Sequence, residues 1–320
     1  MRVLVCGTNY GATYVRALAG GLDNVTLAGI LSTGSARSIA YARQAQVAHY
    51  TSLDSIDSGS IDIACVAVPG EAGHKLALAL LEKGIHVLCE HPIGAKQMSE
   101  ALAVAQMHRR VFQVNAHFAD LLAPQAFYRG LNTARQLGPA LHYDLAVNLR
   151  TLYSGLDLLG RALGSLKNIQ VFSAFGESAR PPMFASLQLV SPTAQVSLLC
   201  QNFASAVDDG TATLLNHRCC ATFAHGNLLL AESNGPLLWL PTPVSMPAQL
   251  WRNYLPVDME QVDAIQLQQQ RDNANRIAIC NLIATVRGQA HQPQQQPEYL
   301  EDLASLWERI LHLLQPGLGT

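Results

Sequence analysis

Residues 2–12 read RVLVCGTNYGA, and this stretch decides the fold. The apolar run Val3–Cys6 predicts a short buried strand. A turn with glycines at Gly7 and Gly11 follows, and Ala12 opens a stretch that predicts a helix over residues 12–19. A strand, a tight turn of small residues and a helix are typical of folds that bind a dinucleotide, whose pyrophosphate lies at the start of the helix.

The turn departs from the usual dinucleotide pattern of Gly, any residue, Gly, any two residues and then Gly or Ala. Gly7 and Ala12 occupy the first and third positions, but Asn9 replaces the second glycine, and Gly11 is the alternative place for a close backbone approach. Small residues are also common in ordinary tight turns, so the position between a strand and a helix gives the pattern its weight. The residues predicted to contact the cofactor here are Gly7, Thr8, Asn9, Tyr10 and Gly11.

Apolar runs and helical stretches continue to alternate through the first third of the chain. Strands are predicted over residues 26–31, 61–68, 85–89 and 111–114, and helices over residues 72–83 and 96–109. Buried strands that alternate with helices of ten or so residues pair in parallel through right-handed crossovers. The sequence therefore predicts a Rossmann-type doubly wound parallel sheet, which we assign to residues 1–118.

The segment LSTGSAR at residues 31–37, where the second predicted strand ends, contains no Asp or Glu. NAD sites usually carry an acidic residue here for the ribose 2′-hydroxyl. Ser32, Ser35 and Arg37 can instead bind a 2′-phosphate through charge-assisted hydrogen bonds, although an exposed loop arginine is the alternative. We therefore predict NADP(H) as the cofactor. Val68 and Pro69, at the end of the third strand, are predicted to line the same site.

The strand predicted over residues 85–89 stops abruptly at Glu90-His91-Pro92. Ligands of open α/β sheets gather beyond the carboxyl ends of the strands, so His91 stands where an imidazole could exchange a proton near neutral pH. The alternative is a loop histidine beside a helix start. Glu90 is predicted to orient the cofactor's sugar or only the turn, and Asn115, at the next strand end, to contact the nicotinamide carboxamide or only to form a turn.

The remaining residues predict a second domain, 119–320, built on a mostly antiparallel open sheet with returning C-terminal helices. Residues 141–150 alternate apolar and polar side chains, which indicates a strand with one buried face. Further strands are predicted over residues 184–190, 195–201, 212–216, 219–224, 227–232 and 237–240, and helices over 152–163, 275–287 and 299–314. The glutamine-rich stretches at 266–270 and 289–296 are typical of solvated connections.

Composition excludes several classes of protein. The 320 residues are 49% hydrophobic and 14% charged, with a net charge of −2, and aromatic residues make up 6%. A dry core is expected, whereas a nucleic-acid partner is not. Seven cysteines without a Cys-x-x-Cys spacing indicate a reducing compartment, and with no signal peptide or membrane span we expect a cytoplasmic protein. The histidine spacing predicts no metal site.

With these motifs in place, the chain resembles the Gfo/Idh/MocA oxidoreductases over nearly its whole length. The resemblance rests on Gly7–Ala12, Gly84–Pro92, Leu156–Leu159 and the closing pair of helices. That family usually has Glu-Lys-Pro where this chain has Glu90-His91-Pro92, and a His three residues before Asp157, where this chain has Ser154. Both departures disfavour a sugar or polyol dehydrogenase.

One branch, the thiazolinyl imine reductases of siderophore biosynthesis, is more similar. The shared segments are Gly34–Ser38, Gly84–Pro92, Leu152–Leu159 and Asn234–Trp239. This resemblance implies NADPH-dependent reduction of a thiazoline C=N bond to thiazolidine. It also implies a substrate held as a thioester on a carrier-protein domain of a nonribosomal peptide synthetase, as for siderophores of the yersiniabactin and pyochelin type.

Hydride addition to the ring carbon requires a proton for the ring nitrogen, and His91 is matched to that role. The branch has a second acid, a Tyr, at the position of Phe118, which cannot donate a proton. His117 or solvent is the alternative donor, although in an extended segment His117 and Phe118 would point in opposite directions. Tyr153 is predicted either to bind substrate through its hydroxyl or to pack its ring in the helix.

Two other functions remain open on the sequence. One is an NADP-dependent dehydrogenase of a sugar or other small carbonyl compound, and the other is a cofactor-binding regulator without turnover. The second sheet is expected to leave one apolar face without helices, so a homodimer through that face is also predicted.

Overall fold

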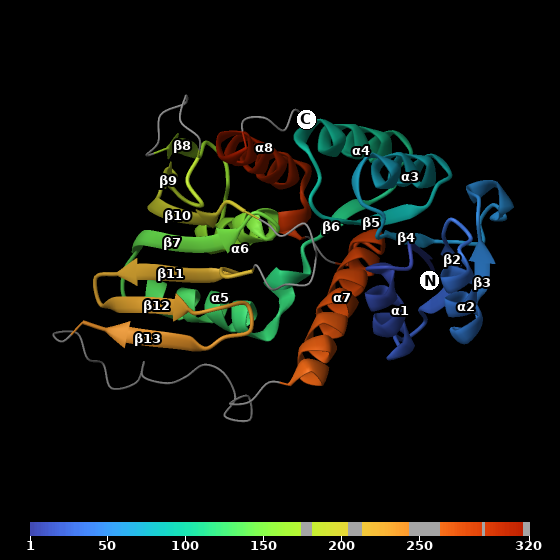
Figure 1. The fold of residues 1–320 in the computed structure, drawn as a ribbon, viewed down its shortest axis with the longest axis horizontal. Helices are drawn as coiled ribbons and strands as arrows, with labels where there is room; N and C mark the ends of the chain where they lie inside the picture. The colour runs from blue at the N-terminus through green and yellow to red at the C-terminus, as the bar shows by residue number, and fades with distance from the viewer. Residues whose placement is uncertain (174–180, 204–212, 243–262, 290–291, 316–320) are drawn as a thin grey trace. The chain divides into compact units, whose positions relative to one another are not determined.

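The structure is a computed structural model that describes residues 1–320 except 174–180, 204–212, 243–262, 290–291 and 316–320 (Figure 1). The chain divides into two compact units. The first comprises Met1–His117 and Gln268–Glu301, and the second comprises Phe118–Leu267 and Asp302–Thr320. The first unit therefore includes a segment that lies far along the chain, in the part that the sequence analysis assigns to the second domain.

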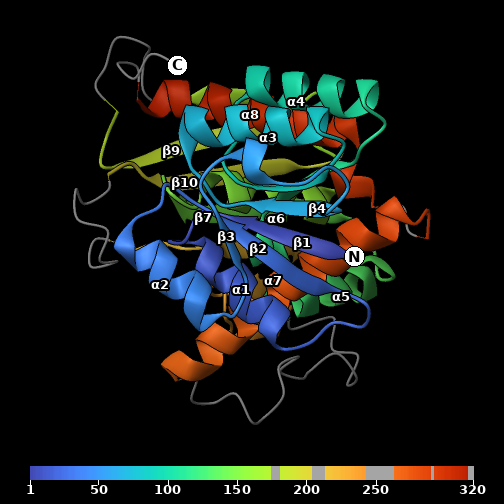
Figure 2. The same cartoon turned by 90° about the vertical axis from the view of Figure 1, so that its right-hand side faces the viewer.

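The first unit contains a six-stranded sheet in the order β3-β2-β1-β4-β5-β6, and every pair of neighbours is parallel (Figure 2). The strands are β1 (Arg2–Cys6), β2 (Thr26–Leu31), β3 (Ala48–Tyr50), β4 (Ile63–Val66), β5 (His86–Glu90) and β6 (Phe112–Asn115). The helices between them are α1 (Gly11–Ala19), α2 (Ala36–Gln44), α3 (Gly70–Glu82) and α4 (Ala95–Met107). The predicted doubly wound sheet is confirmed.

Two elements of this unit, the helix α2 and the strand β3, were not predicted from the sequence. The strand β3 is only three residues long, lies at the edge of the sheet and has no fully buried residue. The helix α2 buries only Ser38 and Ala42. Neither element therefore has the apolar periodicity that identifies a buried strand or an amphipathic helix.

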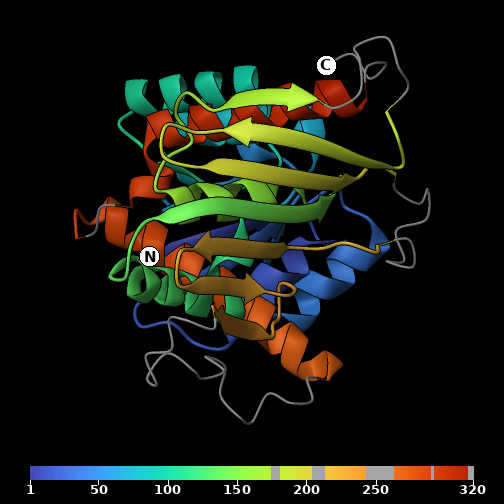
Figure 3. The same ribbon diagram turned by 90° about the vertical axis from the view of Figure 1, so that its left-hand side faces the viewer.

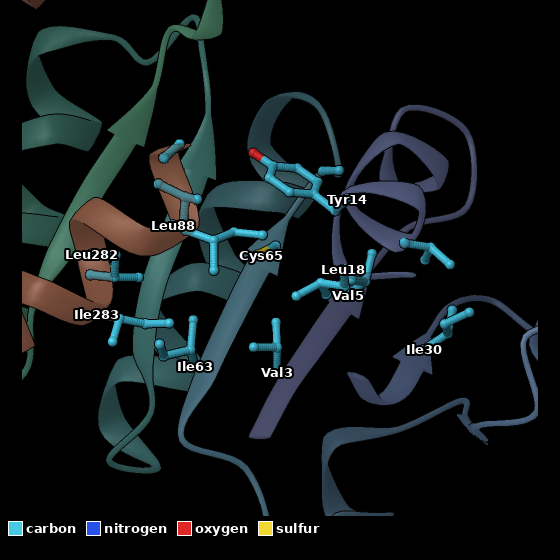
Figure 4. Close-up of a cluster of buried hydrophobic side chains, with 14 of the residues drawn as sticks. Val3, Val5, Tyr14, Leu18, Ile30, Ile63, Cys65, Leu88, Leu282 and Ile283 are labelled. Atoms are coloured by element: carbon cyan, nitrogen blue, oxygen red, sulfur yellow. The ribbon is translucent and has the colours of Figure 1, made fainter. Parts of the chain in front are cut away.

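The core of the first unit combines residues from both ends of the chain (Figure 4). Val3 and Val5 of β1 belong to the same buried cluster as Leu282 and Ile283 of α7 (Ala264–Val286). The expectation of a solvated connection over 266–270 is wrong, because α7 already begins at Ala264. Glutamine has a high helix propensity, so a glutamine run can extend a helix as readily as it forms a linker.

The second unit contains a seven-stranded mixed sheet in the order β13-β12-β11-β7-β10-β9-β8 (Figure 3). Its strands are β7 (Ala140–Asn148), β8 (Gln170–Ser173), β9 (Phe184–Val190), β10 (Gln195–Gln201), β11 (Arg218–Phe223), β12 (Gly226–Leu230) and β13 (Leu237–Pro241). Neighbours pair antiparallel except β7 and β10, which are parallel. The predicted class, a mostly antiparallel sheet with C-terminal helices, is confirmed.

The helices of this unit are α5 (Leu122–Arg135), α6 (Leu152–Leu163) and the greater part of α8 (Pro297–Leu314). Both α5 and α6 contact strands of the sheet, and Figure 3 shows these helices behind the strands. The predicted strand over 212–216 is wrong for residues 213–216, which form no strand, while Ala212 lies outside the described residues. Among the helices of the described residues, none is long and apolar enough to span a membrane.

Candidate functional site

The turn between β1 and α1 brings two backbone segments of the first unit unusually close together. Gly7 has φ +92°, a conformation that disfavours side chains, and its amide donates to the carbonyl of Leu31 at 2.9 Å. A Cβ at Gly7 would lie 2.9 Å from the carbonyl oxygen of Ala67, just beyond β4. Glycine is therefore required at this position by both torsion and space.

The helix α1 begins at this turn, at the edge of the sheet where β1 ends. Its N-cap residue is Tyr10, and no side chain among the described residues caps the helix. A Cβ at Gly11 would lie 3.0 Å from Val5 Cγ1, so the helix packs closely on β1. The first amides of a helix, together with its dipole, bind phosphate groups. The residues present thus fit the pyrophosphate of a dinucleotide, with Thr8 and Asn9 in the turn itself.

At the end of β2, the three residues predicted to bind a 2′-phosphate have different local roles. The Ser32 hydroxyl pairs with His49 Nε2 at 2.8 Å. Ser35 caps α2 by accepting from the amide of Ser38 at 3.2 Å. Arg37 is exposed, and its guanidinium donates to the carbonyl of Thr8 at 3.4 Å, which places it beside the β1–α1 turn.

Val68 and Pro69 follow β4 at the same edge of the sheet. Val68 is half-buried, and Pro69 is the exposed N-cap residue of α3. Gly73 lies against the carbonyl of Val68, where any Cβ would clash. The start of α3 therefore packs directly on the segment that leaves β4.

A buried polar cluster lies at the carboxyl ends of β5 and β6. Tyr14 of α1 donates its hydroxyl hydrogen to Glu90 Oε1. Asn115 Nδ2 lies 2.8 Å from the same Glu90 oxygen, 2.7 Å from the Tyr14 hydroxyl and 2.6 Å from Asn275 Oδ1 of α7. Tyr14 and Asn275 were not predicted from the sequence to belong to the site. Asn115 is thus engaged with protein groups through its amide nitrogen.

Burial raises the pKa of Glu90 to about 8. The hydrogen bonds from Tyr14 and Asn115 favour the ionised carboxylate and act in the opposite direction, but burial outweighs them. The Glu90 carboxyl is therefore predominantly protonated at neutral pH.

His91 is fixed by the backbone of the neighbouring strand. Its Nδ1 lies 2.7 Å from the carbonyl oxygen of Asn115. A carbonyl can only accept, so Nδ1 must carry a hydrogen. The proton that this ring gains or loses is consequently the one on Nε2. Glu90 Oε2 lies 3.8 Å from His91 Nδ1, so the acid and the imidazole are neighbours.

His117 lies in the same unit as His91. The centroids of the two rings are 6.4 Å apart, and His117 Nδ1 pairs with the Tyr10 hydroxyl at 2.9 Å. Residues 117–120 form a 3-10 turn instead of an extended segment. The expectation that His117 and Phe118 point in opposite directions therefore has no basis here, because alternation is a property of strands.

In the second unit, Phe118 packs on His217, a residue that the sequence analysis missed. The ring centroids are 4.4 Å apart. His217 is fully buried between two hydroxyls, with Nε2 2.8 Å from Ser154 Oγ and Nδ1 2.7 Å from Ser233 Oγ. Ser154, the residue that stands in place of the family's His, thus contacts an imidazole 63 residues away in the sequence.

Tyr153 is 1% exposed and packs its ring edge-on against Trp307 of α8, with centroids 5.8 Å apart. This agrees with the alternative in which the ring of Tyr153 packs in the helix. Asp157 pairs with Arg161 one helical turn later at 2.9 Å. Within the described residues, no group of three or more His, Cys, Asp or Glu side chains is arranged to hold a metal ion.

Comparison with known proteins gives two family matches. Residues 1–116 match the NAD-binding Rossmann fold of the Gfo/Idh/MocA oxidoreductase family. Residues 139–240 match the C-terminal domain of the Irp3-like thiazolinyl imine reductases. Inositol 2-dehydrogenase 1 of Saccharopolyspora erythraea is 35% identical over 99 residues, which are 30% of this chain and 29% of that protein. The chain thus aligns with less than a third of the length of this curated relative.

Solved structures share the fold over almost the entire chain. UDP-N-acetylglucosamine 3-dehydrogenase GnnA from Acidithiobacillus ferrooxidans has a TM-score of 0.72 at 13% identity, covering 100% of this chain and 99% of that one. An oxidoreductase from Agrobacterium radiobacter in complex with NAD+, L-tartaric acid and magnesium has a TM-score of 0.76 at 11% identity, covering 99% and 97%. The WlbA dehydrogenase from Bordetella pertussis in complex with NADH and UDP-GlcNAcA has a TM-score of 0.72 at 13% identity, covering 99% and 96%. Identities this low establish the fold alone.

The two matched segments follow one another along the chain, the first similar to an NAD-binding Rossmann fold of oxidoreductases and the second to an Irp3-like C-terminal domain.

Proposed function

We propose that this protein uses NADPH to reduce the C=N bond of a thiazoline ring to a thiazolidine. The observation that favours this reaction over others is the match of residues 139–240 to the Irp3-like thiazolinyl imine reductase domain. The Glu90-His91-Pro92 form of the motif after β5 points the same way, because an imidazole replaces the lysine of the sugar-oxidising relatives.

In this proposal the β1–α1 turn and the start of α1 hold the cofactor's pyrophosphate, and Ser32 and Arg37 bind its 2′-phosphate. When bound, the reduced nicotinamide supplies the hydride that goes to the ring carbon. His91 donates the proton on Nε2 to the ring nitrogen, because its Nδ1 is committed to the carbonyl of Asn115. The positive charge on the protonated imidazole also stabilises electron density that develops on the nitrogen.

His117 is the alternative proton donor. It lies next to His91 and is tied to the Tyr10 hydroxyl, so the two imidazoles and the phenol form one polar group in the first unit. Phe118, which replaces the acid expected beside it, has no proton to give. One of these two histidines therefore takes the role in our proposal, and His91 is the first choice.

We propose further that the substrate is a siderophore intermediate of the yersiniabactin or pyochelin type, presented as a thioester by a carrier-protein domain of a nonribosomal peptide synthetase. This assignment follows from the resemblance to the thiazolinyl imine reductases and is a proposal about the partner as well as the reaction. The cytoplasm is the proposed location, because the cysteine usage indicates a reducing compartment.

A homodimer is also proposed, through the open face of the second sheet. Figure 3 shows the strands facing the viewer on this side. Large apolar side chains on it are partly exposed. They are Phe172 at 52%, Phe184 at 42%, Val190 at 37%, Leu238 at 37% and Leu240 at 48%. Apolar area of this kind favours association with a second copy.

A second candidate is an NADP-dependent dehydrogenase of a sugar or another small carbonyl compound. The relative inositol 2-dehydrogenase 1 and the dehydrogenases among the solved structures favour it. This relative, however, matches over only 30% of the chain, so the similarity supports a dehydrogenase for that part of the chain only.

The test of the proposed function is NADPH oxidation with a small thiazoline thioester mimic, followed through the nicotinamide absorbance. Wild type is compared with His91→Ala and, as the matched variant on the neighbouring imidazole, His117→Ala. We expect turnover by wild type, a loss of about tenfold or more in kcat for His91→Ala, and unchanged NADPH binding, because a positioned acid typically contributes a factor of ~10²–10⁴.

Turnover that survives in His91→Ala but is lost in His117→Ala would transfer the proton donor to His117 and keep the reaction. If wild type binds NADPH but does not turn the mimic over, while a sugar or polyol is oxidised with NADP+, the dehydrogenase is the correct function.

A further inference from the structure

His49 has no role in the proposed function, and nothing in the sequence pattern predicted one. It is the middle residue of β3, at the edge of the parallel sheet, and its backbone pairs with Ile30 of β2. Its side chain reaches past the end of β2, where Nε2 lies 2.8 Å from Ser32 Oγ. Both residues are half-buried, so the pair is neither sealed in the core nor fully solvated.

The backbone around Ser32 is held by the same edge strand. The Ser32 amide donates to the carbonyl of Tyr50 at 3.0 Å. Gly34 has φ +82°, and a Cβ there would lie 3.1 Å from Thr51 Cγ2, so the turn is packed against the residue that follows β3. The distance between His49 and Ser32 is therefore set by backbone contacts and does not depend on a flexible loop.

The orientation of the Ser32 hydroxyl depends on whether Nε2 of His49 carries a hydrogen. A serine hydroxyl has one hydrogen and two acceptor positions. The Gly34 amide donates to Ser32 Oγ at 3.4 Å and uses one of these positions. When His49 Nε2 carries a hydrogen and donates it to the other position, the hydroxyl hydrogen of Ser32 is left to point toward a ligand.

This orientation matters for a 2′-phosphate more than for a 2′-hydroxyl. Phosphate oxygens in the ionised state only accept, so every group that binds them must donate. A ribose 2′-hydroxyl both donates and accepts and can adapt to either orientation of Ser32. A residue that forces Ser32 to donate outward therefore favours the phosphorylated cofactor.

The neighbouring serine cannot supply the same donor. Ser35 accepts from the Ser38 amide at 3.2 Å and places its hydroxyl hydrogen on Ser38 Oγ, also at 3.2 Å, as part of the cap of α2. Arg37, with its guanidinium beside Thr8, adds positive charge but leaves the orientation of Ser32 unaffected.

From these contacts we infer that His49 is a positioning residue for coenzyme choice, which selects NADPH over NADH by holding the Ser32 hydroxyl as a donor to the 2′-phosphate. The inference rests on the NADPH preference within the proposed function, and it adds a residue on the neighbouring strand that touches the cofactor only through Ser32.

The test is direct binding of NADPH and NADH to the full-length protein, followed by nicotinamide fluorescence in the absence of any thiazoline. We expect wild type to bind NADPH more tightly than NADH. His49→Phe should raise the Kd for NADPH about tenfold, the usual effect of losing a hydrogen bond to a charged group, and leave the Kd for NADH within about twofold. His49→Gln, whose amide can donate from a position close to Nε2, should restore most of the NADPH affinity.

Ser32→Ala provides the control that separates action through Ser32 from any other role. In the Ser32→Ala background, His49→Phe should change the NADPH affinity no further. Thermal unfolding of each variant shows whether the edge strand survives, and His49→Leu replaces His49→Phe if the phenyl ring is not accommodated.

Four results would overturn the inference. Equal losses of NADPH and NADH affinity in His49→Phe would mean that the substitution acts on the structure and not on coenzyme choice. If His49→Phe lowers NADPH affinity as much in the Ser32→Ala background as in wild type, His49 does not act through Ser32. An NADPH preference unchanged in His49→Phe would leave the proposed cofactor intact and refute the role of His49 alone. If wild type does not prefer NADPH at all, the cofactor assignment in the proposed function fails together with this inference.

Discussion

Glu90 is a carboxylic acid that the fold keeps protonated near neutral pH. Its ordinary pKa of 4.5 is raised to about 8 by burial, although Tyr14 and Asn115 both donate toward it. The folded chain therefore keeps this proton up to a higher pH than the unfolded chain does. It follows that the free energy of unfolding contributed by Glu90 falls as the pH rises from about 4.5 to about 8 and is constant outside that window.

Replacement of Glu90 by Gln tests this consequence, because glutamine resembles the protonated carboxyl and does not titrate. We expect Glu90→Gln to gain stability relative to wild type as the pH rises from about 5 to about 8, with each unit of the pKa shift worth about 1.4 kcal/mol at most. Urea unfolding at a series of pH values gives the difference directly. Glu82→Gln, at an exposed position near the end of α3, is the matched control and should show no such trend.

A constant difference between Glu90→Gln and wild type over that pH range would mean that the Glu90 carboxyl is ionised in the folded protein. The hydrogen bonds from Tyr14 and Asn115 would then outweigh burial, contrary to the direction given above.

Residues of the candidate site differ in how readily the sequence reveals them. Glu90, His91 and Asn115 can be placed because each ends or follows an apolar run, and the carboxyl ends of parallel strands meet at one edge of the sheet. Tyr14 and Asn275 cannot, because one reads as an ordinary helix residue and the other lies 160 residues from Asn115. Long-range hydrogen bonds leave no periodic pattern in the sequence.

At the scale of elements, the β1–α1 connection depends on a single glycine. Gly7→Ala places a Cβ against the carbonyl of Ala67 and holds alanine at φ +92°. We expect a loss of about 1–3 kcal/mol in unfolding free energy and a large loss of NADPH affinity, since the turn must move away from the start of α1. Thermal unfolding and NADPH titration measure the two effects.

The control for this change is Gly21→Ala, which has a similar φ of +79° and no atom within 4 Å of the added Cβ. It should cost stability through its backbone torsion alone and leave NADPH affinity unchanged. Equal losses of NADPH affinity in the two variants would show that the close approach to Ala67 has no part in binding.

Elements with strong apolar patterns follow the sequence closely, and those without them do not. The predicted helix over 152–163 and the strands over 184–190 and 195–201 have the bounds that the structure gives for α6, β9 and β10. The parallel pairing of β7 with β10 could not be predicted from the sequence. The partner of a strand depends on the path of the chain between strands, and the residue pattern within a strand does not show that path.

For the whole molecule, the open face of the second sheet predicts a homodimer in solution. Phe172→Glu and Leu240→Glu place charges on that face, where both native residues are about half-exposed. We expect wild type to have the mass of a dimer by light scattering and both variants to shift toward monomer, because burying an unpaired carboxylate is costly.

Met107→Glu is the matched control, since Met107 is 76% exposed and belongs to α4 of the first unit, not to the second sheet. It should leave the dimer unchanged. A monomeric mass for wild type would end the proposal of a homodimer, whatever the variants do.

The return of the chain to the first unit has a consequence for the order of synthesis. Val3 and Val5 leave the ribosome long before Ile279 and Leu282 of the same core cluster. Part of the core of the Rossmann sheet therefore stays uncovered until α7 has been made, and by then every strand of the second sheet is already available to pair. Nascent chains stalled before α7 are for this reason the ones most in need of a chaperone.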